Sequence, residues 1–207
     1  IGHMLNGQPI SCIQRPETGR ELTFSHLSPA PEKKKILVIG GGPAGMKATA
    51  VAASRGHSVK LIEATSKLGG QVNLAERLPG RSEFGGITTN LENMLRTQDV
   101  EIKLNTEASL QLIREEAPEV IILATGGKSF EPKIEGKESA HVVTAWQLLE
   151  GKANVGSRVV IADWRCDWVG LGVAELLARQ GCHVRLACNG MVPGQTINQY
   201  VLSLIHI

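Results

Sequence analysis

The chain has 207 residues, of which 42% are hydrophobic and 20% are charged, so it can bury a proper core in one or two α/β domains. A net charge of only +2, the lack of long basic blocks and an aromatic content of 3% argue against a nucleic-acid or membrane partner. No apolar span of about 18 residues and no charged-then-apolar leader occurs, so we expect neither a transmembrane helix nor a signal peptide, and a cytoplasmic location.

The four cysteines form no C-x-x-C pair, which disfavours a zinc site and a thioredoxin-like dithiol. Cys182 and Cys188 flank a predicted buried strand, and we expect them to be inert core thiols; the others are Cys12 and Cys166. The histidines, which include His26, His57 and His141, are scattered among loops and strands and indicate no alternative chemistry.

Residues 1–34 show no sustained periodicity and are expected to form an N-terminal arm and linker, which ends in a stretch rich in serine, proline and lysine. Gly2-His3-Met4 resembles an expression-vector remnant, and residues 203–207 are not typical of the end of a domain, so both are excluded from the fold prediction. We expect a first domain over residues 35–150 and a second, partial domain over residues 151–202.

The first predicted strand runs directly into a glycine-rich turn. Ile36–Ile39 are apolar without alternation, which is typical of a strand buried on both faces of a parallel sheet. Gly40, Gly42 and Gly45 then fill the G-x-G-x-x-G spacing, with Pro43-Ala44 between them. In this motif the first glycine permits a tight turn, the second lets the backbone approach a pyrophosphate, and the third lets helix pack closely on strand. The stretch therefore predicts a phosphate cradle.

The residues after this turn support the same interpretation. An alanine-rich helix is predicted from Pro43 to Arg55, followed by Gly56 and a strand over Ser58–Ile62. Glu63, next to Ala64, falls close to the spacing of roughly 20 residues at which an acid binds ribose hydroxyls. Glu63 and Ala64 are therefore candidate nucleotide contacts. The alternative is an α/β packing turn with no ligand.

Further candidate contacts follow along the chain. Gly70 and Gln71 lie in a loop whose backbone could close over a nucleotide, although it could also be a simple loop. Arg81 could bind a phosphate or be solvated. A helix is predicted over residues 86–98, with a core-facing apolar stripe. Ala108 follows a short strand over Glu101–Leu104, at a place where some flavoproteins contact adenine through backbone atoms.

An apolar strand is predicted over Glu119–Thr125, and it ends in the small residues Ala124-Thr125-Gly126. Small residues at the carboxyl edge of a parallel sheet suit the close approach of backbone to a cofactor. These three residues complete the set of candidate cofactor contacts. The fold class expected is α/β, a Rossmann-like FAD/NAD(P)-binding fold with a parallel sheet.

A second Rossmann-like unit is predicted from strands over residues 158–162 and 183–188 and a helix over residues 169–180. Its turn lacks the tight glycine pattern. We expect Trp164 and Trp168 to occupy the space of a dinucleotide, and Glu175 to stand where the third glycine would be. This partial, inserted domain is therefore predicted not to bind NAD.

Several motifs, in this order, resemble the C-terminal half of the large old-yellow-enzyme group of NADH:flavin oxidoreductases, typified by 2,4-dienoyl-CoA reductase and trimethylamine dehydrogenase. They are residues 12–21, the glycine turn, Gly69-Gly70-Gln71, Pro79-Gly80-Arg81 and Ala124-Thr125-Gly126. The resemblance implies an FMN-bearing barrel and a 4Fe-4S cluster upstream, followed by an FAD- or ADP-binding domain with an inserted nucleotide-like domain. Cys12 matches the last of the four cluster cysteines, and its partners would lie upstream of residue 1; Arg15 departs from the usual asparagine.

The resemblance also bears on activity. Residues 163–168 and 194–200 look more like the amine-oxidising and N-demethylating members than like the enoyl reductases. Such a member sends electrons from its substrate to FMN, to the cluster and on to an acceptor, and it needs no NAD site. In the family a later segment completes the FAD site, and nothing after Tyr200 resembles it, so we expect this fragment to bind FAD weakly or not at all and to contain no catalytic residue.

The expected partners are the upstream FMN barrel of the same chain and an electron acceptor. Two alternatives stay open. One is a non-redox structural module that binds ADP or nothing. The other is a small independent NAD(P)H reductase of the pyridine-nucleotide disulfide type, which the missing C-x-x-C pair disfavours.

Overall fold

The computed structural model describes residues 7–9, 12, 14–24 and 26–197. The chain divides into two compact units. Of the described residues, unit 1 contains those up to Asn73 together with Glu83–Gly127, and unit 2 contains Leu74–Ser82 and those from Lys128 to 197. The domain limits expected from the sequence stay a prediction. The suspected vector remnant at 2–4 and the tail at 203–207 lie outside the described residues.

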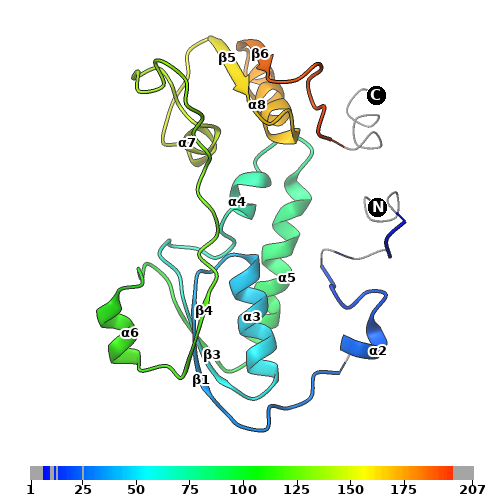
Figure 1. Ribbon diagram of the computed structural model, residues 1–207, viewed down its shortest axis with the longest axis vertical. Helices are drawn as coiled ribbons and strands as arrows, with labels where there is room; N and C mark the ends of the chain where they lie inside the picture. Colours follow the sequence, from blue (N-terminus) through cyan, green and yellow to red (C-terminus); the bar gives the residue numbers. More distant parts are fainter. Residues whose placement is uncertain (1–6, 10–11, 13, 25, 198–207) are drawn as a thin grey trace. The chain divides into compact units, whose positions relative to one another are not determined.

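Unit 1 is built on a parallel sheet of four strands in the order β3-β2-β1-β4 (Figure 1). These strands are β1 (Lys35–Ile39), β2 (Ser58–Ile62), β3 (Val100–Lys103) and β4 (Val120–Leu123). In the register, Ile36 of β1 pairs with Val59 of β2 on one side and with Val120 of β4 on the other. All four strands were expected from the sequence, and the predicted Rossmann-like parallel fold is confirmed.

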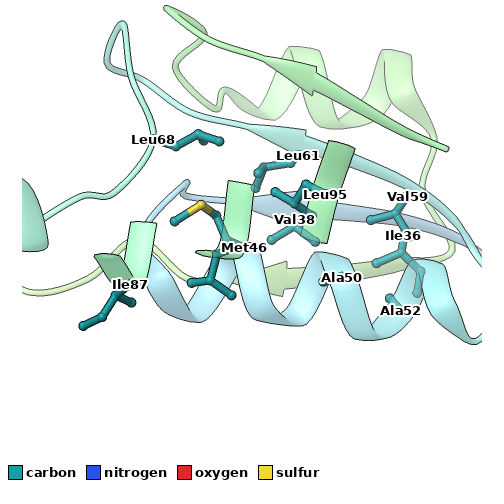
Figure 2. Packing of buried hydrophobic residues seen from close by; sticks show 11 residues of the cluster. Ile36, Val38, Met46, Ala50, Ala52, Val59, Leu61, Leu68, Ile87 and Leu95 are labelled. Carbon is teal, nitrogen blue, oxygen red and sulfur yellow. The ribbon is translucent and has the colours of Figure 1, made fainter. Parts of the chain in front are cut away.

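Helices α3 (Pro43–Ser54) and α5 (Gly85–Arg96) cover one face of this sheet. Figure 2 shows the core between them, where Val38, Met46 and Leu61 are completely enclosed. Met46 comes from α3 and the other two from adjacent strands, so the core joins the helix after the glycine turn to the centre of the sheet. Burial of this apolar surface, at about 25 cal/mol per Å², fixes the start of α3 relative to β1.

The opposite face is covered by the short helix α6 (Leu110–Glu116), as Figure 1 shows. Leu112 and Ile113 of α6 pack on a small core formed by Leu37, Ile39 and Ile62. This cover does not extend over β4, where the side chains of Ile121 and Leu123 are 42% and 74% exposed. The central strand β1 is thus buried on both faces, while β4 is one of the two edge strands of the described sheet, the other being β3.

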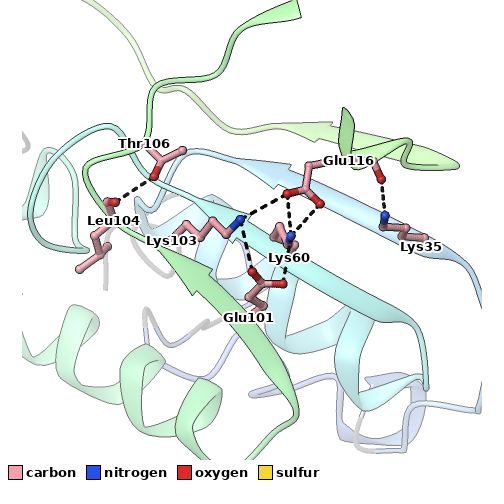
Figure 3. A network of polar contacts seen from close by, with 7 residues as sticks. All are labelled: Lys35, Lys60, Glu101, Lys103, Leu104, Thr106 and Glu116. Carbon is pink, nitrogen blue, oxygen red and sulfur yellow. Dashed lines mark hydrogen bonds and ion pairs between the residues drawn. The ribbon is translucent and has the colours of Figure 1, made fainter. Parts of the chain in front are cut away.

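A network of ion pairs lies on the same side of the sheet as α6 (Figure 3). Lys60 of β2 reaches Glu116 at the end of α6, at 2.6 Å, and Glu101 of β3, at 3.0 Å. Lys103 also contacts both carboxylates, and Lys35 donates to the backbone carbonyl of Glu116. The network ties the end of α6 to three strands.

Unit 2 contains a parallel pair of strands, β5 (Arg158–Asp163) and β6 (His183–Cys188), with helix α8 (Trp168–Arg179) between them in sequence. Helix α7 (Ala145–Glu150) begins with a capping box made by Thr144 and Gln147. The hydrophobic core of unit 2 contains Leu78, Leu149, Val173 and Leu177. The short elements of the chain are α2 (Glu21–Phe24), α4 (Val72–Ala75) and the 3₁₀ helix η1 (Ser82–Phe84).

The predicted strand-helix-strand order of this second unit is confirmed. Among the described residues, no helix is both long enough and apolar enough to span a membrane.

Candidate nucleotide-binding site

The glycine turn between β1 and α3 is tightly packed at two of its three motif positions. A Cβ atom on Gly40, which has φ +108°, would collide with the carbonyl group of Ala124, and one on Gly45 would collide with the carbonyl oxygen of Gly40. A Cβ on Gly42 would meet nothing within 4 Å. Gly40 and Gly45 therefore let β1, β4 and α3 approach one another, and Gly42 leaves open space in front of the helix.

This open space lies at the N-terminus of a helix of 12 residues, α3. Gly42 is the N-cap residue, Pro43 occupies the first turn, and no side chain caps this helix. The backbone N–H groups of the first turn, including those of Ala44 and Gly45, carry the positive end of the helix dipole. An uncapped helix start beside open space fits an anionic group such as a pyrophosphate.

Glu63 follows β2 at the same edge of the sheet and is 9% exposed. Its Oε2 accepts a hydrogen bond from Gly41 N at 2.6 Å, and its Oε1 accepts two, from Thr65 N and Thr65 Oγ1, both at 2.7 Å. Burial alone would raise the pKa of Glu63, but the hydrogen bonds from Thr65 and Gly41 outweigh it and hold the pKa below its ordinary value. Glu63 is thus a carboxylate that fastens the glycine turn.

The segment after β3 lies beside Glu63. Thr106 N donates to Glu63 O, and Asn105 N donates to Thr65 O, both at 2.9 Å. These bonds hold the backbone of residues 105–106 next to the stretch that contains Ala64. Ala108 packs against the core under α6 and is half-buried. The adenine contact expected at Ala108 stays a prediction.

Two further segments close on the turn. Gly69 N donates to Gly41 O at 2.9 Å, and a Cβ on Gly70 would lie 3.1 Å from Gly42 Cα. Ala124 N donates to Ile39 O at 2.8 Å, and Gln71 Nε2 donates to Gly127 O at 3.0 Å, next to Thr125-Gly126. The structure therefore brings the cradle together with Gly70, Gln71 and the end of β4. Their contact with a cofactor stays a prediction.

Arg81 belongs to unit 2 and not to the unit that holds the cradle. Its guanidinium lies over the ring of Trp168, at 5.0 Å from the ring centroid. This is the geometry of a cation–π contact, in which the arginine packs on an aromatic residue at the start of α8. The phosphate contact expected for Arg81 stays a prediction.

The turn of unit 2 differs from the prediction in one respect. Gly170 makes the close approach of α8 to β5, because a Cβ there would collide with the side chain of Asp163. The expectation that Glu175 occupies the third glycine position is therefore wrong. Trp168 packs in the core of this unit, and Trp164 is 48% exposed. The occlusion of a dinucleotide by these tryptophans stays a prediction.

Cys12 is half-buried, and no group of three or more cysteine, histidine or acidic side chains that could hold a metal occurs among the described residues. Its role as a cluster ligand stays a prediction about a longer protein.

The sequence did not predict the residues whose hydrogen bonds hold the loops of this site in place. Gly41 and Thr65 bond to Glu63, and Asn73 Nδ2 donates to the carbonyl of Leu68 at 2.9 Å. Thr65 offered a signal, since a hydroxyl two residues after an acid commonly forms a local turn bond. Gly41 offered none, because its partner is distant in sequence.

Comparison with known proteins identifies the family. Residues 34–189 match the family described as pyridine nucleotide-disulphide oxidoreductase. The chain is 35% identical over 206 residues to N,N-dimethylglycine/sarcosine dehydrogenase of Chromohalobacter salexigens, covering 95% of this chain and 30% of that protein. It is 35% identical over 205 residues to a probable N-methylproline demethylase of Rhizobium meliloti, covering 99% and 30%.

The solved structure of a 2-naphthoyl-CoA reductase complex superposes with a TM-score of 0.91 at 32% identity, covering 99% of this chain and 31% of that one. The chain thus spans about a third of the length of the proteins it matches. A dehydrogenase, a probable demethylase and a CoA-ester reductase agree with the family that the resemblance implied. The chain belongs to the pyridine nucleotide-disulphide oxidoreductase family, and it matches a region of longer proteins of the large old-yellow-enzyme type.

Proposed function

We propose that this chain is the FAD- or ADP-binding region of a flavin and iron-sulfur oxidoreductase, and that the whole protein transfers electrons to or from an FMN held in an upstream barrel. The observation that carries this proposal is the open position at Gly42. A Cβ at this position would meet nothing within 4 Å, and the position stands at the start of a helix that no side chain caps. The adjoining residue, Gly41, is bonded to Glu63 and to Gly69.

The residues present fit an adenosine diphosphate group. The pyrophosphate would be held at Gly42 and the first turn of α3, with Gly70 and Gln71 beside it. A ribose hydroxyl would donate to Glu63, whose carboxylate has about four acceptor positions, three of which are used within the chain. The backbone near Ala108 and Ala124-Thr125-Gly126 would border the rest of the ligand. A flavin bound here would supply electron transfer.

We favour an amine-oxidising, N-demethylating parent over an enoyl reductase. Two relatives at 35% identity are an N,N-dimethylglycine/sarcosine dehydrogenase and a probable N-methylproline demethylase. In unit 2, the buried side chain of Asp163 stands where α8 approaches β5, and an acidic side chain there disfavours a phosphate. A unit that rejects NAD suits an enzyme that sends electrons outward through the 4Fe-4S cluster to which Cys12 would contribute.

A second candidate is a structural module that binds ADP without taking part in redox chemistry. It is favoured because the groups that we expect this site to hold, pyrophosphate, ribose and adenine, are all present in ADP. The two candidates differ in whether the flavin part of FAD adds affinity.

The test is calorimetric titration of this chain with ADP and with FAD, using a matched pair of variants. Gly42→Ala places a methyl group in the open space without meeting any neighbour. Gly156→Ala is the control, because a Cβ there also meets nothing within 4 Å, and Gly156 lies in unit 2. We expect Gly42→Ala to lower the affinity for both ligands at least tenfold with an unchanged melting temperature, and Gly156→Ala to bind as the parent chain does.

Unchanged binding by Gly42→Ala, or no binding of ADP by the unsubstituted chain, would contradict the proposed site. Equal affinities for ADP and FAD would favour the structural module, and a clear preference for FAD would favour the redox function. Retention of FAD through gel filtration would overturn the expectation that this chain binds flavin weakly.

A further inference from the structure

Two cysteine side chains from separate segments of unit 2 meet at Gly190. Cys188 is the last residue of β6 and pairs in register with Asp163, the last residue of β5. Cys166 lies three residues beyond Asp163, in the loop that leads to α8. Cys188 Sγ lies 3.5 Å from the carbonyl oxygen of Gly190, and a Cβ on Gly190 would lie 2.9 Å from Cys166 Sγ. Both sulfur atoms therefore border one glycine.

The loop that carries Cys166 is firmly held. The backbone N of Cys166 donates to Asp163 Oδ1 at 2.9 Å, and the carbonyl oxygen of Cys166 accepts from Thr196 Oγ1 at 2.9 Å. Asn189 N, next to Cys188, donates to Asp163 O at 3.0 Å. Cys166 also adopts φ +52°, a left-handed conformation that few side-chain-bearing residues accept. Such a conformation persists only where the surroundings enforce it, so the thiol is fixed in place.

The two thiols differ in access. Cys166 is 3% exposed, and burial, followed by the charge of Asp163 and by the neighbouring Cys188 thiol, raises its pKa. Cys188 is half-buried and reachable from solvent. Because thiolates are the attacking species in disulfide exchange, Cys188 is placed to react first and Cys166 to react second.

We propose that Cys166 and Cys188 form a reversible disulfide by exchange with a low-molecular-weight disulfide of the glutathione class. The Cys188 thiolate attacks one sulfur of the small disulfide, whose S–S bond breaks and releases one small thiolate. The small thiolate released in this step takes the proton of Cys166, whose Sγ lies 3.8 Å from the carbonyl oxygen of Asp163. The Cys166 thiolate attacks the Cys188 sulfur and releases the second small thiol. Two protein thiols are oxidised, and the small disulfide is reduced.

The bond would join the loop between β5 and α8 to the end of β6. That loop occupies the place where the phosphates of a dinucleotide meet a Rossmann-like helix. Oxidation would therefore fix this turn in the conformation described here, and a reductant would release it. The expectation that Cys188 is an inert core thiol does not hold under this proposal.

The test is incubation of the folded chain with oxidised glutathione, followed by intact mass measurement and peptide mapping. We expect the loss of two hydrogen atoms, a Cys166–Cys188 linkage, and a melting temperature a few degrees higher that returns to its initial value on reduction with dithiothreitol. Cys166→Ser should stop at a stable mixed disulfide of glutathione on Cys188. Cys188→Ser should leave Cys166 unmodified.

Cys182→Ser is the matched control, because Cys182 is also half-buried and lies next to the start of β6, with its Sγ 3.7 Å from the carbonyl oxygen of Gly156. This variant should form the same linkage as the parent chain. A linkage that involves Cys182 or Cys12, a mixed disulfide that persists on the unsubstituted chain, or unreactive thiols in the folded state would each overturn the proposal. Mapping of the unsubstituted chain decides the matter even if a serine at Cys166 prevents folding.

Discussion

Glu63 Oε2 and Gly41 N are joined by a buried hydrogen bond of 2.6 Å across 22 residues of sequence. This bond ties the end of β2 to the middle of the glycine turn. The acid that the motif assigns to ribose binding therefore also supports the turn itself, since its second oxygen is held by Thr65. Support and binding are combined in one side chain, so both should respond to its substitution.

Glu63→Gln should weaken the fold and the site together. The amide NH₂ group of glutamine would face either the Gly41 N–H or the Thr65 donors, and a buried donor without an acceptor costs about 1–3 kcal/mol. We expect urea denaturation to show a loss of that size in the free energy of unfolding, and calorimetry to show weaker ADP binding. Glu32→Gln, at an exposed position, is the control and should change neither. A normal free energy of unfolding for Glu63→Gln would contradict this role.

The same carboxylate sets an acid limit. The pKa of Glu63 in the folded chain lies below its ordinary value of 4.5, so the folded state holds the proton less tightly than the unfolded state does. Its contribution to stability should be full above the ordinary pKa and should be lost as the pH falls through the lowered folded value. Denaturation curves collected across this range should show a smaller pH dependence for Glu63→Gln; an identical dependence would refute the assignment.

The ion-pair network should give a limit at high pH. The hydrogen bonds that Lys60 donates to Glu116 raise the pKa of Lys60 above the ordinary value of 10.5, despite the opposing effect of partial burial. The contribution of Lys60 is therefore complete below 10.5 and should be lost as the pH rises through the raised folded value. Lys60→Met should remove this alkaline step in thermal melts, whereas Lys128→Met, at an exposed position, should keep it. An alkaline step of equal size in Lys60→Met would argue against the network as its source.

Gly45→Ala should destabilise unit 1 severely. The added methyl group would collide with the carbonyl oxygen of Gly40, which is backbone and cannot move aside as a flexible side chain can. We expect a loss of about 3 kcal/mol or more in the free energy of unfolding, at the upper end of overpacking effects. Gly42→Ala in the same turn is the comparison and should fold normally. Equal stability of the two variants would show that the turn can relax.

Arg81→Gln should act on unit 2. Loss of the contact between its guanidinium and the Trp168 ring should cost about 0.5–1 kcal/mol of stability. The tryptophan fluorescence should change as well, and the ADP affinity of the chain should not. Arg81→Lys should recover part of the stability. A fall in ADP affinity with unchanged stability would instead support the phosphate contact that the sequence suggested.

The parts of the site that the sequence predicted are those that contiguous residues encode. The apolar run of β1, the spacing of Gly40, Gly42 and Gly45, and the acid after β2 each follow from local pattern. The bond between Gly41 and Glu63 could not be predicted, because it depends on how two strand ends meet at one edge of the sheet.

Other misses had identifiable causes. Helix α7 carried a signal in its capping box, Thr144 with Gln147. The N-cap residue of α6 is Ser109, whose side chain accepts a hydrogen bond from Leu112 N. Both are short, and a helical period is hard to detect in one or two turns. The error at Glu175 arose from counting glycines along the sequence, whereas the contact between Gly170 and Asp163 is defined by packing.

The exposed edge strand β4 affects how every measurement on this chain alone should be carried out. In the part of the chain that the structure describes, no strand pairs with its outer edge, and Ile121 and Leu123 are exposed along it. An edge of this kind is a template on which a strand from another molecule can add. Two copies could thus associate edge to edge at high concentration, and protein concentration becomes a variable to control in each titration and melt.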